Sequence, residues 1–411
     1  MTVPTGRTPL RRRRRLRAGS AQLLCTLLGL GLGLALPRIA GGPRVPGPQA
    51  NEMLVGLGFG VLGVTVVILS LLVVVVQWAH TTFSPRLTLF SNAPLVWRTF
   101  AFAIGLAVYC LTAVLATGTA ATVTLAVPVV TGVLVLVLLA LLRTLQLRAF
   151  TSLQLAPVLH SVTERGRGLL DSLHARRSAG ADRLTAPPGP PGASGPPPTT
   201  VSWPHPVAVL QQVDTERLLA AARRADAVVV LRAVPGDTLP YGATVAQVHG
   251  ARLDAAQVLA ALVTGTDRTF DQDPLLAFRL LADIVLRALS PAVNDPATAV
   301  QGLDCLEDLL RAPAALSAGP LGIPDRDGTV RIVVQLPAWE DFLRTGVDDV
   351  IAAAGNAPMV LIRLRTMLLG LHGQGEPDRH GLVGRRLAWV ERRLTDRYPV
   401  LWDELDRPAA D

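Results

Sequence analysis

Charge is distributed very unevenly along this chain of 411 residues. Residues 1–150 contain thirteen arginines and one acidic residue, Glu52, whereas the rest contains twenty-six arginines and thirty acidic residues. The net charge therefore changes from +12 in the first part to −4 in the second. Between the arginines of the first part lie four apolar stretches without Asp, Glu, Lys, Arg or His. About 20 apolar residues suffice for a helix to cross a bilayer, so the first third is predicted to be membrane and the rest water-soluble.

The charge pattern also predicts an orientation. The four spans are expected at Ala18–Leu36, Met53–Trp78, Thr99–Gly118 and Ala120–Leu142. The N-terminal tail has seven arginines and the segment after span four has six up to Arg177, whereas the turn after span one and the segment between spans two and three have two each. The positive-inside rule therefore places both termini, and the segment between spans two and three, in the cytoplasm, below the plasma membrane. The basic surplus is expected to meet anionic inner-leaflet lipid, and no nucleic acid is expected as a partner. An alternative takes Arg11 to Leu36 as a secretory signal, which would leave three spans and an external soluble domain.

The fold class expected is a membrane α-helical bundle of four transmembrane helices, followed by a soluble α+β cytoplasmic domain. The parts are a basic cytoplasmic tail at 1–17, the four-span domain at 18–150, an amphipathic connecting helix at 151–185, a Pro/Gly-rich linker at 186–200 and the α+β domain at 201–411. Seven prolines between Ala186 and Pro198 favour a semi-rigid linker that cannot pack a core.

Periodicity and capping residues predict the elements of the soluble part. Strands are expected at Val207–Val213, Ala227–Val234, Thr244–His249 and Val330–Leu336. Helices are expected at Asp214–Arg224, Asp254–Thr264, Pro274–Leu289, Pro296–Arg311, Ala338–Ala354, Pro358–Leu371 and Leu382–Thr395. The turn at Pro235-Gly236-Asp237 between two strands is similar to the hairpins of lipoyl-like hammerhead modules, but the chain has no lysine, which excludes a carrier function.

Several function classes find no support in the residues. The three cysteines and seven histidines form no metal-binding spacing, and no known catalytic or nucleotide-binding motif occurs, so neither a metal nor a cofactor is expected. Spans without ionisable residues disfavour ion-coupled transport. Two G-x-x-x-G pairs, Gly29 with Gly33 and Gly56 with Gly60, predict close helix contacts, either within one bundle or between copies.

The most distinctive segment runs from Ser290 to Ala299, between two apolar helices. Pro291 should end the first helix, while Asp295 followed by Pro296 should cap and begin the second. Asp273 before Pro274 should begin the preceding helix in the same way. One interpretation is a sharp capped joint and nothing more. The other is a ligand site at a helix N-terminus, formed by the motif's polar residues and prolines. Its candidate residues are Ser290, Pro291, Asn294, Asp295, Pro296 and Thr298.

These residues carry a family resemblance. The S-P-x-x-N-D-P-x-T-A string from Ser290 to Ala299 resembles the hallmark of the DUF2254 family of predicted bacterial membrane proteins, whose function is uncharacterised. The tetrad Phe83-Ser84-Pro85-Arg86 matches a second hallmark, and Tyr109-Cys110-Leu111 is similar to its Y-C-L. The resemblance covers nearly the whole chain. Two departures are the proline-rich linker and Leu142-Arg143-Thr144-Leu145, which stands where such families often carry histidines.

The function expected is an oligomeric, channel-like or sensing membrane assembly with a cytoplasmic ligand- or partner-binding domain, more readily non-enzymatic than enzymatic. The alternatives are an enzyme acting at the inner leaflet through the Ser290–Thr298 patch, and a pure scaffold. The tetrad Phe83, Ser84, Pro85 and Arg86 is expected at the membrane interface, where Arg86 would bind lipid phosphate. On the cytoplasmic side this tetrad could also contact Ser290–Ala299.

Overall fold

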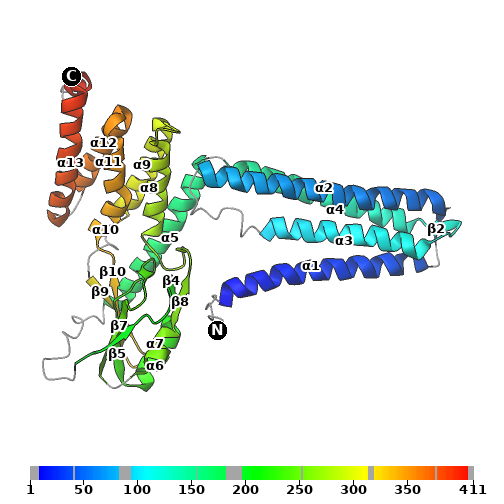
Figure 1. The fold of residues 1–411 in the computed structure, drawn as a ribbon, viewed down its shortest axis with the longest axis horizontal. Helices are drawn as coiled ribbons and strands as arrows, with labels where there is room; N and C mark the ends of the chain where they lie inside the picture. The colour runs from blue at the N-terminus through cyan, green and yellow to red at the C-terminus, as the bar shows by residue number, and fades with distance from the viewer. Residues whose placement is uncertain are drawn as a thin grey trace. The chain divides into compact units, whose positions relative to one another are not determined.

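The computed structural model describes residues 9–39, 42–82, 94–153, 155–181, 197–250, 253–312, 319–374 and 377–405. The chain divides into two compact units, and the boundary falls between Gln154 and Leu155. Each is described by itself (Figure 1). The membrane unit, Thr8–Gln154, is helical, and the C-terminal unit, from Leu155 onward, mixes helices with sheets. An apolar helical region followed by an α+β region is what the charge pattern predicts.

The membrane unit is built around its third helix. Its helices are α1 (Pro9–Ala35), α2 (Gly47–Thr82), α3 (Pro94–Thr117) and α4 (Ala126–Leu153). Among the described residues, all four contain windows long and apolar enough to cross a membrane, which confirms the prediction of four candidate spans. The window in α3 is 56% buried, against 11%, 11% and 17% in α1, α2 and α4. Most apolar side chains of the outer three helices therefore face away from the bundle, as expected of residues that contact lipid.

Small residues let α1 approach α3 closely. A Cβ added to Gly29 would stand 2.1 Å from the carbonyl oxygen of Gly105, and one added to Gly33 would stand 1.9 Å from Thr112 Oγ1. The first G-x-x-x-G pair thus packs within the bundle. On α3, the Tyr109 hydroxyl donates to the carbonyl oxygen of Val127 on α4 at 3.2 Å, and Cys110 is fully buried. The Y-C-L segment is therefore part of the packing between these helices.

The predicted start of span four is wrong. The prediction placed it at Ala120, but residues Thr122–Thr124 form strand β2, which pairs antiparallel with β1 (Arg44–Pro46), and α4 begins at Ala126. The cause is that two β-branched threonines flank a valine here, and this triplet suits a paired strand as well as an apolar helix. Span one is followed by a short 3₁₀ turn, η1 (Leu36–Arg38).

In the C-terminal unit, α5 (Leu155–Ala181) packs against the hairpin formed by α8 (Leu276–Ala288) and α9 (Pro296–Arg311). Gly166 makes this crossing tight, because a Cβ there would lie 2.6 Å from the Cβ of Ala277. Val158, Leu159, Val162 and Leu170 of α5 are all buried. The connecting helix that the sequence predicts is therefore an integral part of this unit's core.

Two sheets form the β part of the unit. The first has the order β3-β7-β5-β10-β9, in which β10 runs parallel to β5 and the other neighbours are antiparallel; the second has the order β6-β4-β8. The strands are β3 (Thr199–Ser202), β4 (Ala208–Val213), β5 (Ala227–Leu231), β6 (Thr238–Leu239), β7 (Thr244–Gly250), β8 (Leu262–Gly265), β9 (Gly319–Pro324) and β10 (Val330–Leu336). The register places Ile332 of β10 beside Val229 of β5.

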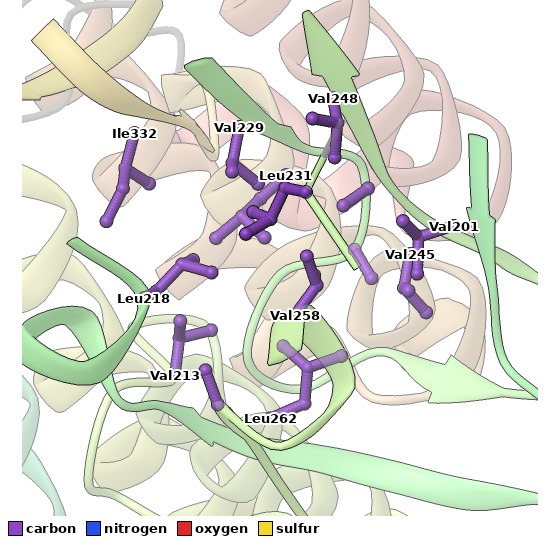
Figure 2. Close-up of a cluster of buried hydrophobic side chains, with 14 of the residues drawn as sticks. Val201, Val213, Leu218, Val229, Leu231, Val245, Val248, Val258, Leu262 and Ile332 are labelled. Carbon is purple, nitrogen blue, oxygen red and sulfur yellow. The ribbon is translucent and has the colours of Figure 1, made fainter. Parts of the chain in front are cut away.

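The core of the β part lies between the sheets and two short helices, α6 (Thr215–Arg224) and α7 (Ala255–Leu259). Figure 2 shows side chains from both sheets pointing toward one another, among them Val213, Leu231 and Ile332, with Leu218 of α6 and Val258 of α7. Every second residue of β5 is buried, namely Ala227, Val229 and Leu231, which matches the period of a strand with one face in the core.

The helices predicted over Asp254–Thr264 and Ala338–Ala354 differ from the structure over much of their length. The helix expected over Asp254–Thr264 ends at Leu259, and its second half is strand β8, because Val263 and Thr264 are β-branched and pair with β4. The helix expected over Ala338–Ala354 consists of α10 (Trp339–Leu343), a π-helical turn η2 (Arg344–Asp348) and α11 (Asp349–Ala353). The turn contains Gly346, where a Cβ would lie 3.0 Å from Leu306 of α9.

The remaining helices are the 3₁₀ turn η3 (Ala354–Asn356), α12 (Pro358–Gln374), α13 (Pro377–Arg397) and α14 (Pro399–Leu405). Of these, α12 packs on α9, α13 packs on α12, and α14 packs on α13. Arg363 of α12 pairs with Asp304 and Glu307 of α9, and Arg386 of α13 pairs with Asp348. Phe278 of α8 meets Phe342 of α10 edge to face, with ring centroids 4.9 Å apart.

Candidate functional site

The motif Ser290–Ala299 forms the joint between α8 and α9. Helix α8 ends at Ala288, three residues before Pro291, whose ring cannot continue a helix. The Ser290 hydroxyl donates to the carbonyl oxygen of Arg287 at 2.7 Å, and the amide of Asp295 donates to the carbonyl oxygen of Ala288 at 2.8 Å. The second bond satisfies a carbonyl group that the end of α8 would otherwise leave open, and the first adds to the bond that the Ser290 amide already makes with Arg287. The chain reverses direction within seven residues.

Asp295 caps α9 in the way the sequence predicts. Its Oδ1 accepts a hydrogen bond from the backbone amide of Thr298 at 3.1 Å, and its Oδ2 accepts one from the Thr298 hydroxyl at 2.6 Å. These two bonds hold the pKa of Asp295 below its usual value, and the bond from the hydroxyl has the larger effect. Pro296 occupies the first helical position, where its missing N–H costs nothing.

The structure brings the predicted site residues together on one partly exposed turn. Pro291 and Asn294 are exposed, whereas Ser290, Asp295, Pro296 and Thr298 are half-buried. Asn294 has a φ of +48°, in the left-handed region that asparagine tolerates better than most residues. The hydroxyls of Ser290 and Thr298 and the carboxylate of Asp295 already bond within the joint. The observed geometry thus accounts for these groups as caps, and Asn294 is left as the exposed polar side chain.

A second cluster, which the sequence did not single out as a site, lies in the loop before α8. The carboxylate of Asp273 is 1% exposed and accepts hydrogen bonds from Arg268 Nε at 2.6 Å and Nη2 at 2.8 Å. It also accepts one from the amide of Leu275 at 3.1 Å. The helix begins at Leu276, so the prediction of a start at Pro274 is two residues early. Asp273 is a buried ion-pair partner as well as a cap for the turn that leads into α8.

This loop joins the β part to the helices. Gln272 exchanges two hydrogen bonds with the backbone of Val213 at the end of β4, with distances of 2.9 and 3.1 Å. Gly236 lies against the carboxylate of Asp273, and a Cβ there would be 2.6 Å from Oδ2. Gly236 also has a φ of +103°, which favours glycine. In the sequence the cluster is visible only as an arginine five residues before an aspartate, and this spacing is too common to predict an ion pair.

The tetrad Phe83–Arg86 and possible metal ligands are the remaining features considered from the sequence. Phe83, Ser84, Pro85 and Arg86 lie outside the described residues, so the contact expected between this tetrad and the joint stays a prediction. Within the described ranges, no three His, Cys, Asp or Glu side chains gather closely enough to hold a metal ion. Asp267 and Asp271, in the loop before α8, belong to no such group.

Comparison with known proteins places the chain in a family. A family model described as "Predicted membrane protein (DUF2254)" matches residues 20–369. The chain is also similar to Uncharacterized protein Mb1321c of Mycobacterium bovis and Uncharacterized protein Rv1290c of Mycobacterium tuberculosis, each 28% identical over 268 residues. These alignments cover 62% of this chain and 49% of each relative, so the chain spans about half the length of the curated relatives it matches. No solved structure matches it. The chain belongs to the DUF2254 family of predicted membrane proteins.

Proposed function

We propose that the protein is a non-enzymatic membrane assembly in which copies of the chain associate through α2, and that its C-terminal unit binds a ligand or partner. A channel-like or sensing role would follow from such an assembly. One observation carries the proposal. Gly56, Gly60 and Gly63 of α2 lie on an open face, and a Cβ added to any of them would meet no described residue within 4 Å.

The open face differs from the glycines that serve the bundle. On the same helix, Gly58 faces α3, where an added Cβ would lie 3.1 Å from the Cβ of Cys110. The stripe of Gly56 and Gly63 continues at seven-residue spacing to Ser70, which is also exposed. Val67 and Val74, 57% and 58% exposed, lie along the same line. Small residues with flanking valines let two membrane helices approach closely, and backbone approach is the main source of association where lipid is as apolar as the helix.

The test compares two sets of open glycines in the full chain, reconstituted in lipid nanodiscs and studied by native mass spectrometry. The triple variant Gly56→Leu, Gly60→Leu, Gly63→Leu should lower the oligomeric state, because its side chains hold a second helix away. The control is Gly132→Leu on α4, where an added Cβ also has nothing within 4 Å in the described part of the chain, and it should leave the oligomer unchanged. A monomeric wild type, or a triple variant with the wild-type state, would overturn the proposal.

We also propose the plasma membrane as the location, with both termini in the cytoplasm. The support is the excess of arginines before the first apolar span and after the fourth. The same arginines are proposed to bind anionic inner-leaflet lipid. A protease added outside intact cells should leave epitope tags at both termini uncut, and cleavage of the C-terminal tag would reverse the orientation.

A further inference from the structure

Two adjacent loops of the C-terminal unit form an exposed apolar surface, called here the neutral rim. It consists of Pro204–Val207, which follow the buried Trp203 between β3 and β4, and Pro240–Gly242, between β6 and β7. Tyr241 is 79% exposed and Val207 is 69% exposed. Pro204, His205, Pro206 and Pro240 are exposed as well, and neither loop contains Arg, Asp or Glu. A contiguous exposed patch of this composition marks an interaction surface more often than isolated apolar side chains do.

The neutral rim is held in one shape by its own hydrogen bonds. The amide of Trp203 donates to the carbonyl oxygen of Ala243, and the amide of Gly242 donates to the carbonyl oxygen of Trp203, both at 2.8 Å. The Trp203 indole N–H donates to the carbonyl oxygen of Pro206 at 2.9 Å. The indole also meets the His205 ring edge to face, with centroids 5.0 Å apart. Because the loops are already ordered, little conformational entropy is lost when the surface binds.

We propose that the neutral rim contacts the lipid–water interface of the membrane that holds the spans. Its chemistry fits that environment, since Tyr241 combines an apolar ring with a polar hydroxyl, and the exposed prolines and Val207 are apolar and uncharged. Proximity supports it too. Helix α4 ends at Leu153 and α5 begins at Leu155, so the C-terminal unit is covalently tethered to a membrane helix by a short connection. Loops without carboxylates avoid the cost of bringing acidic groups to anionic headgroups.

The experiment places one fluorescent probe on the rim of the full chain in nanodiscs that hold a single copy. In a background with Cys25→Ala, Cys110→Ala and Cys305→Ala, an environment-sensitive dye is attached at Tyr241→Cys. The matched control carries the same dye at Asp327→Cys in the β9–β10 turn, where the side chain is 67% exposed. Lipids with a spin label just below the headgroup should quench the dye at position 241 and leave the dye at position 327 bright.

A companion variant separates the rim from the dye. Adding Val207→Ser to the labelled chain removes an apolar neighbour, which should shift the equilibrium away from lipid contact on the order of tenfold and so reduce quenching. Equal quenching at positions 241 and 327, or none at 241, would overturn the proposal. Blue-shifted emission at 241 without lipid quenching would also overturn it, because a protein surface would then cover the rim. With one copy in each disc, the result is independent of association through α2.

Discussion

Removing the Asp295 carboxylate tests whether the family motif is a structural joint. In the Asp295→Ala variant the backbone amide of Thr298 loses its acceptor at the start of α9. Replacing an N-cap residue by alanine costs about 1 kcal/mol, within a range of roughly 0.5–2. The second bond, from the Thr298 hydroxyl, adds little, because this half-buried group can turn to water. We therefore expect a loss of about 1–2 kcal/mol.

Amide hydrogen exchange of the full chain in nanodiscs measures this loss locally. Protection in α8 and α9 should fall by roughly the 5- to 30-fold that 1–2 kcal/mol represents. The control is Asp214→Ala, which removes an ordinary cap whose Oδ1 accepts from the amide of Arg217 at 3.0 Å. If the motif is only a joint, both variants should lose similar protection, each around its own helix. No loss at Asp295→Ala would refute the reasoning, and so would a small molecule that raises protection around the joint in the wild type but not in Asp295→Ala.

The pH dependence adds a second check on the same residue. The folded pKa of Asp295 lies below its usual value, because the hydroxyl and amide of Thr298 bond the ionised form. A lowered folded pKa contributes stability that is present above the unfolded pKa of about 4 and is lost as the pH falls through the folded pKa. The protection of the wild type should therefore exceed that of Asp295→Ala by a constant factor near neutral pH. The two should converge below about pH 4.

Two further predictions concern packing. Gly29→Leu should prevent α1 from packing on α3, because the added Cβ would lie 2.1 Å from the carbonyl oxygen of Gly105. The control is Gly31→Leu, whose added Cβ would meet no described residue within 4 Å. The yield of folded, monodisperse protein in mild detergent should fall for Gly29→Leu only. Arg268→Ala should leave the buried Asp273 carboxylate unpaired and cost up to about 3–5 kcal/mol, seen as a lower urea midpoint of tryptophan fluorescence. Normal packing of Gly29→Leu or an unchanged midpoint of Arg268→Ala would contradict the respective account.

Elements whose signal is local could be predicted from the sequence. Helix Pro296–Arg311 begins with a capping aspartate and a proline, and strand Val330–Leu336 is an apolar β-branched run; both have the predicted bounds. The prediction failed where a distant partner decides. Residues 262–264 form a strand because β4 lies beside them, and residues 122–124 do so because β1 does. Strand β9, Gly319–Pro324, contains two prolines, which argue against a strand in the sequence. The structure tolerates them because β9 is an edge strand.

In the candidate site, too, features with a local signal could be predicted and features that depend on distant residues could not. The capping role of Asp295 follows from its position before Pro296, so the sequence is enough to predict it. The pairing of Arg268 with Asp273 depends on a loop held by Gln272 against β4, and no local pattern encodes that contact. The two glycine pairs read identically in the sequence, yet only packing shows that Gly29 and Gly33 serve the bundle while Gly56 and Gly60 face outward.

The most direct test of the proposed assembly is oxidative crosslinking in native membranes. A single cysteine is placed at Gly60→Cys on the open face of α2, in a chain whose three native cysteines are replaced by alanine, and Gly132→Cys on α4 is the control. Association through α2 predicts a disulfide-linked dimer from Gly60→Cys and none from Gly132→Cys. Equal crosslinking at both positions, or none at Gly60→Cys, would contradict it.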